Sequence, residues 1–210
     1  MKKGIVFSII AFSFVCTASV YGAQGFYVSG NIGLAMLSDA DAEDPSLPGI
    51  AATMEFDSGV VLSAALGYEW ENFRLEGEYA YQTNDFDKQE AFGLSLDLTG
   101  DLVSQSLLVN GYYDFATQSK FTPFITAGLG MARVDVNDLA LPGSWQEPYS
   151  DDDTVFAGQV GAGISYAVHE QFDIDFQYRY FMTDDLEFSD GSTLDGLASH
   201  NVYLGLRYRF

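Results

Sequence analysis

Along most of the chain, apolar and polar residues alternate with a period of two, which is the pattern of a β-strand with one apolar face. The last segment shows it most clearly, because Val202, Leu204 and Leu206 alternate with residues such as Gly205 and Arg207. Eight segments follow the pattern: 26–36, 60–70, 73–82, 103–115, 125–132, 156–167, 172–183 and 201–210. The sequence therefore predicts an all-β fold of eight strands.

The connections between these segments alternate in length. The short ones lie at 71–72, 116–120 and 169–170, and the long ones lie at 38–58, 84–101, 135–153 and 184–198. Short turns at one rim and long loops at the other are typical of a bacterial up-and-down barrel with periplasmic turns and extracellular loops. Lipid offers no hydrogen-bond partners, so a spanning sheet has to close on itself. We therefore expect an eight-stranded antiparallel up-and-down transmembrane β-barrel.

The N-terminus has the order of a secretory signal peptide. Lys2 and Lys3 precede an apolar run from Ile5 to Val15, and small residues follow. We expect residues 1–23 to be the signal peptide and residues 24–210 to be the outer-membrane β-barrel, so the expected location is the cell outer membrane. The single cysteine, Cys16, falls in the discarded segment, so the mature chain has no disulfide.

Charge is unevenly distributed along the chain. The sequence has 30 acidic and 9 basic residues and a net charge of −21, which excludes nucleic acid as a partner. The four long loops hold 22 of the acidic residues and one basic residue, Lys88. The predicted barrel wall is therefore nearly balanced, and the excess negative charge belongs to the loops.

Within the predicted wall, most charged residues have the parity of the inner face. This barrel-interior charge network comprises Glu69, Arg74, Glu76, Glu78, Asp173, Asp175, Arg179, Arg207 and Arg209. The turn positions predict that Glu69 lies opposite Arg74, Asp173 opposite Arg209, and Asp175 opposite Arg207. An eight-stranded barrel is just wide enough for its own side chains, so these groups are expected to form a plug. A narrow channel for small solutes is the alternative.

Two motifs resemble a known family. The Tyr208-Arg209-Phe210 terminus resembles the C-terminal signal that the barrel-assembly machinery reads, with Tyr208 and Phe210 as its aromatic residues. The run from Pro123 to Gly130 is similar to a strand of the opacity-protein-like outer membrane protein beta-barrel domain family, the porin family proteins. The resemblance implies an outer-membrane surface protein, and members serve adhesion, surface antigenicity, envelope integrity or small-solute passage.

Enzymatic chemistry is not indicated. His169 falls in a predicted turn and His200 lies near the loop rim, and neither belongs to a Ser-His-acid set. We therefore expect no catalytic residues, no cofactor-binding residues and no enzyme activity.

Carboxylates of two loops are weak candidates for metal ligands. These are Asp151, Asp152, Asp153, Asp184 and Asp185. Carboxylate oxygens suit Ca²⁺, although the spacing does not match an EF-hand. We expect at most loosely bound divalent cations, which would bridge the loops to lipopolysaccharide phosphates.

The leading hypothesis is a structural or surface-interaction protein whose wall anchors it and whose acidic loops meet the outside. The expected partners are outer-membrane lipid or lipopolysaccharide, the barrel-assembly machinery, and an extracellular cationic partner. A third reading is a soluble lipocalin-like barrel, in which the apolar face would point inward.

Overall fold

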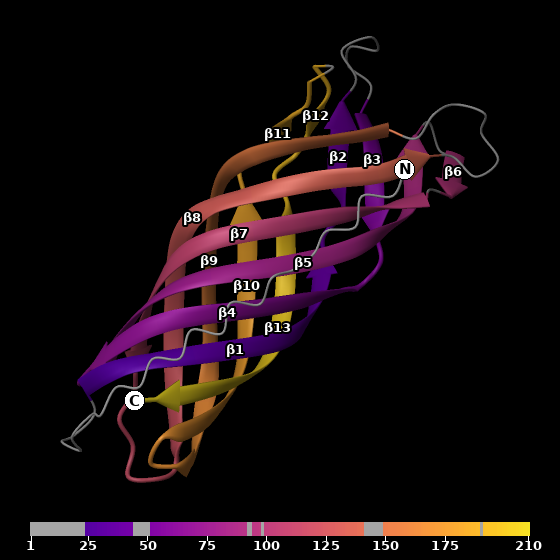
Figure 1. Cartoon of the computed structure of the whole chain (residues 1–210). Coiled ribbons are helices and arrows are strands. Elements are labelled where there is room, and N and C mark those ends of the chain that lie inside the picture. The colour runs from indigo at the N-terminus through magenta and orange to yellow at the C-terminus, as the bar shows by residue number, and fades with distance from the viewer. Residues whose placement is uncertain (1–23, 44–50, 92–93, 98, 141–148, 190) are drawn as a thin grey trace, which may run out of the picture.

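Eight long strands form a closed antiparallel barrel (Figure 1). The computed structural model describes residues 24–43, 51–91, 94–97, 99–140, 149–189 and 191–210. The barrel strands are β1 (Gln24–Leu37), β4 (Gly59–Trp70), β5 (Phe73–Ala91), β7 (Thr99–Asp114), β8 (Phe121–Ala140), β9 (Tyr149–His169), β10 (Phe172–Thr183) and β13 (Ala198–Arg209). Strand β13 returns to pair with β1, and Tyr27 lies opposite Arg209 at this closure. The predicted fold class is therefore confirmed.

The expected signal peptide, residues 1–23, lies outside the described residues. Among the residues that are described, no helix is long and apolar enough to cross a membrane.

The barrel is apolar outside and polar inside. Leu34, Leu107 and Leu129 are 62%, 67% and 61% exposed, whereas Arg74 and Arg179 are 2% and 1% exposed. In water this distribution would leave a large apolar surface uncovered, so it requires lipid around the wall. The lipocalin-like reading, with the apolar face inward, is therefore wrong.

Aromatic side chains form a girdle at the short-turn end of the wall. Consecutive rings lie 5.0–6.2 Å apart across β1, β4, β5 and β7, in the order Phe26, Tyr68, Trp70, Phe73, Tyr113 and Phe115. The rings of Tyr208 and Phe172 lie 4.9 Å apart, and that of Phe210 lies 5.2 Å from Tyr208. Amphipathic rings favour the membrane–water boundary, so this girdle marks one edge of the lipid-facing band.

The opposite end differs from the sequence prediction. Segments expected as loops 84–101 and 135–153 are largely strand, because β5, β7, β8 and β9 continue past the lipid-facing band. Five short strands lie beside these extensions: β2 (Ala40–Glu43), β3 (Ala51–Phe56), β6 (Leu94–Asp97), β11 (Leu186–Glu187) and β12 (Thr193–Leu194). We call this assembly the cap. Figure 1 shows it at the end of the barrel away from the C-terminus.

The cap has its own apolar core. Its buried members are Leu37, Ala40, Phe86, Leu102, Val134, Val136, Val155, Leu186, Leu194 and Leu197. Along β8 the inner face changes from Thr126 to Val134, while the outer face changes from Leu129 to Arg133. The polarity of the two faces therefore inverts where the strands leave lipid, since water then becomes the outer solvent. The prediction of loops was wrong here because a strand was expected only where the outer face was apolar, and the outer face of these extensions is polar.

Candidate functional site: the barrel interior and its cap

A buried ion pair lies at the centre of the barrel. Arg179 on β10 donates from Nη1 to both carboxylate oxygens of Glu78 on β5, at 2.7 and 2.6 Å. Both side chains are 1% exposed. Removing two charges from water is costly unless their remaining hydrogen-bonding groups are also satisfied, so the surrounding contacts matter.

Polar side chains from three other strands, β4, β7 and β9, and Glu76 of β5 surround this pair. Arg179 Nη2 donates to the Tyr112 hydroxyl at 2.9 Å, and that hydroxyl donates to Glu76 Oε2 at 2.8 Å. Glu78 also accepts from Gln159 Nε2 at 3.2 Å and from Ser63 Oγ at 3.2 Å. The network therefore links opposite walls and occupies the middle of the lumen.

A second cluster lies nearer the short turns. Arg207 contacts Asp173 at 3.0 Å, and both Asp175 and Glu69 at 3.5 Å, while Arg209 contacts Asp173 at 2.6 Å. The predicted cross-strand register was wrong by two residues, because Asp173 lies opposite Arg207 and Asp175 lies opposite Gly205. The connection at 184–198 contains the short strands β11 and β12 and is not a symmetric hairpin. Counting from its centre therefore gave the wrong partners. The expected ion pairs nevertheless form, diagonally across the strands.

Arg74 lies opposite Glu69 in the register, as predicted, but its ion pair is with another residue. Its Nε and Nη2 each donate to Asp114 at 2.8 Å, and its guanidinium lies 4.2 Å from the Tyr112 ring centroid. Glu69 instead contacts Arg207 and Arg209. Sequence reasoning did not select Asp114, although its inward parity next to a short turn was a usable signal.

Glycines on the inner face of β8 and β9 make room for larger neighbours. A Cβ at Gly163 would meet the Phe124 ring at 2.5 Å, and one at Gly161 would meet Arg179 at 3.0 Å. Large side chains of neighbouring residues therefore fill the space that the glycines leave.

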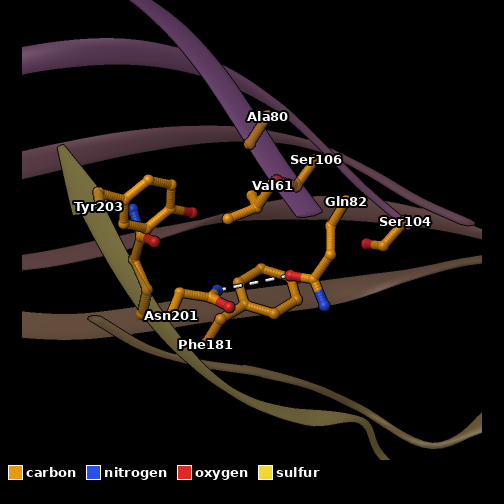
Figure 2. Close-up of a pocket in the computed structure, with 9 residues that line it drawn as sticks. Val61, Ala80, Gln82, Ser104, Ser106, Phe181, Asn201 and Tyr203 are labelled. Carbon is orange, nitrogen blue, oxygen red and sulfur yellow. Dashed lines mark hydrogen bonds between the residues drawn. The ribbon is translucent and has the colours of Figure 1, made fainter. Parts of the chain in front are cut away.

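From the Glu78–Arg179 ion pair toward the cap, the side chains of the interior become neutral and then apolar. Figure 2 shows a cavity at this level, where Asn201 donates to Gln82 at 3.4 Å beside Phe181 and Tyr203. The cavity volume is about 10 Å³, which is about the space for a single water. The cap core lies beyond it.

Two of the metal candidates, Asp151 and Asp153, accept hydrogen bonds from a neighbouring segment. Asp151 accepts from Ser189 N at 2.8 Å and Oγ at 2.6 Å, and Asp153 accepts from Glu187 N at 3.0 Å. These two carboxylates therefore hold the β11 segment against β9. The Ser189 hydrogen bonds lower the pKa of Asp151 below its usual value, because they favour the charged form.

The remaining candidates do not converge on one point. Asp152 lies on the outer face and contacts Arg133 at 3.1 Å, while Asp185 accepts from Gly196 N at 2.9 Å. Within the described ranges, no three His, Cys, Asp or Glu side chains are grouped as metal ligands would be.

The two histidines lie at opposite rims. His169 ends β9 at an exposed turn, and its Nδ1 accepts from Gln171 N at 3.4 Å. His200 lies on the outer face of β13, where its Nδ1 is 2.6 Å from the Tyr178 hydroxyl.

Comparison with known proteins gives consistent results. The family described as "Outer membrane protein beta-barrel domain" matches residues 7–210. The chain is 26% identical to "Outer membrane protein PagN" of Salmonella typhimurium over 239 residues, which covers all of both chains.

Solved structures show the same barrel. Neisserial surface protein A is 25% identical with a TM-score of 0.59, and the match covers 90% of this chain and 100% of that one. OprG of Pseudomonas aeruginosa is 18% identical with a TM-score of 0.56, covering 89% and 97%, and this likeness concerns the fold alone. The chain is thus a protein of the outer membrane, and it belongs to the outer membrane protein beta-barrel domain family.

Proposed function

We propose that the protein is a closed surface barrel, in which the wall anchors an acidic cap that interacts with the exterior and no solute passes through. The observation that carries the proposal is the filled interior, where the buried Glu78–Arg179 pair lies beneath an apolar cap core. A solute path would need polar space through the cap, and the buried core cluster of the cap is apolar.

Single-channel recording in planar bilayers tests the closed barrel against the narrow channel. We expect no reproducible conductance steps from the purified protein, while a porin in the same bilayer gives steps. Steps that shrink when Asn201→Trp fills the interior cavity would instead establish the channel.

The cap supports a cationic partner. Its exposed acidic residues are Asp39, Asp41, Asp57, Asp85, Asp138, Asp152, Asp184, Asp185, Glu187 and Asp195. Arg133, a basic residue at this end, already contacts two carboxylates, Asp135 and Asp152. Such a surface attracts cationic proteins at low ionic strength and repels polyanions.

Binding of an oligolysine peptide to the barrel in nanodiscs tests this surface. We expect salt-sensitive binding that weakens when Asp57, Asp138 and Asp195 are changed to Asn. The matched control changes Glu71 and Glu170, which lie exposed at the short-turn end, to Gln. Equal effects of both sets would contradict a cap-specific surface.

We also propose that divalent cations bridge the acidic cap to lipopolysaccharide phosphates, because two anionic surfaces otherwise repel each other. Chelator should then lower the thermal unfolding temperature of the barrel in lipopolysaccharide-containing vesicles. An unchanged transition would contradict the bridging.

A non-catalytic role completes the proposal. The relatives are named as outer membrane and surface proteins. The contacts of His200 with Tyr178 and Tyr180 supply no nucleophile–base–acid series. Hydrolysis of ester or peptide substrates by the purified barrel, lost in His200→Ala, would contradict this role.

A further inference from the structure

An apolar groove crosses the outer face of β4, β1, β13 and β10. Its volume is about 300 Å³, and its lining residues are Ile32, Gly33, Leu34, Val60, Phe176, Val202, Tyr203 and Leu204. Val202 is half-buried at its floor, whereas Leu34, Phe176 and Leu204 are 62%, 55% and 56% exposed. The groove is therefore a depression within the lipid-facing band.

A polar pair, Tyr178 and His200, lies beside this groove on the side of the cap. His200 precedes Val202 by two residues and lies nearer the cap, so both are on the outer face of β13. Tyr178 lies opposite Val202 and Tyr180 lies opposite His200 in the β10–β13 register. The Tyr178 hydroxyl is 2.6 Å from His200 Nδ1, and the Tyr180 ring centroid is 5.0 Å from the imidazole.

These contacts fix the imidazole and leave its other nitrogen for a ligand. When Nδ1 accepts the Tyr178 hydroxyl proton, Nε2 carries a hydrogen and donates. His200 is exposed at the level where apolar residues of β13 give way to the cap. Arg133, a basic residue on the outer face of β8 at this end, is neutralised by Asp135 and Asp152.

We propose that the groove holds an acyl chain of a phosphorylated outer-leaflet glycolipid, and that His200 Nε2 donates a hydrogen bond to its phosphate. The groove is continuous with the lipid-facing band, and His200 lies where a headgroup would begin. This inference rests on the outer-membrane location and not on the closed-barrel function.

Native mass spectrometry of the detergent-folded barrel tests the site, with a synthetic diphosphorylated lipid A and its dephosphorylated form as probes. We expect one retained lipid A and at least several-fold weaker retention of the dephosphorylated form. His200→Ala should abolish that preference, His200→Gln should restore part of it, and Val202→Phe should weaken retention of both forms.

Two further variants separate folding from binding. Tyr178→Phe keeps the ring but removes the hydroxyl that orients His200, so it should reduce the preference in a folded barrel. Leu129→Phe, on the lipid-facing side of β8, should change nothing. Equal retention of lipid A by wild type, His200→Ala and Val202→Phe would overturn the site. A lipid-free dimer that Val202→Phe disrupts would also overturn it. Conductance steps in planar bilayers would contradict the closed-barrel proposal and would not affect the lipid site.

Discussion

At the residue scale, the interior is organised by partners that come from distant strands. Arg179 and Glu78 are 101 residues apart in the chain, and their pair is completed by Tyr112, Gln159 and Ser63. Arg179 and Glu78 are each held by several other groups as well as by each other. Removing one partner therefore has a larger effect than removing both.

The central ion pair gives a testable asymmetry. Glu78→Ala leaves the Arg179 guanidinium buried without its counter-charge, which should lower the free energy of unfolding by about 3–5 kcal/mol. Replacing both residues with Met should cost much less, because no charge is then stranded. Urea unfolding in lipid vesicles measures both, with Glu170→Ala at an exposed turn as the control. A double variant as unstable as Glu78→Ala would contradict this account.

Asp151 in the cap gives a prediction for pH. Its pKa is lowered in the folded protein by the hydrogen bonds from Ser189. The stabilisation is thus present above the pKa of the unfolded chain, ~3.9 for an ordinary aspartate, and is lost as the pH falls through the lower folded value.

We expect the Ser189 amide resonance, followed by NMR, to shift with a midpoint below that ordinary value. The shift should be absent in Asp151→Asn. A midpoint at or above the ordinary value would show that the β9–β11 contact does not favour the carboxylate.

At the element scale, the extended strands β5, β7, β8 and β9 each pass from lipid into water. The outer face of β8 presents Leu129 and Met131 to lipid and Arg133 to water, while its inner face changes in the opposite sense. Side-chain parity continues unbroken through the boundary. The strand therefore keeps its hydrogen-bond ladder while its burial pattern inverts.

Close approach between β8 and β7 gives a prediction for two glycines. A Cβ at Gly130 would overlap the backbone of Leu107 and Leu108, whereas nothing lies within 4 Å of a Cβ at Gly77. Gly130→Ala should lower the free energy of unfolding by about 1–3 kcal/mol. Gly77→Ala should stay within about 0.5 kcal/mol. The same urea series measures both, and equal effects would contradict the packing at β8.

At the scale of the whole molecule, closure of β13 on β1 leaves no unpaired edge in the lipid-facing band. The cap is an extension of the same strands, with a separate apolar core. Resistance of the barrel to detergent should therefore not depend on the cap.

Gel mobility tests that independence. The unboiled protein should migrate differently from the boiled protein, since a closed hydrogen-bonded sheet resists detergent until it is heated. Leu186→Asp, which places a charge in the cap core, should keep this difference while making the cap sensitive to protease. Loss of the mobility shift in Leu186→Asp would show that cap and barrel fold as one unit.

The sequence by itself determined the number of barrel strands, the alternation of short turns and long connections, and the inward parity of the charges. Each of these is local, since a period of two and a turn length are properties of neighbouring residues. Asp114 and the ion-pair partner of Arg74 were not predicted, because inward parity selects a face but not a partner. Only the tertiary structure decided which carboxylate each arginine meets, since that depends on register and on side chains from across the lumen.

The cap also depended on tertiary structure. Val134 and Val136 lie on the inner face together with Leu186 and Leu197, which come from a connection 50–63 residues later in the chain. No local pattern brings these residues together. The whole barrel sets the height at which the outer solvent changes from lipid to water. That height decided where the outer face becomes polar and the inner face becomes apolar.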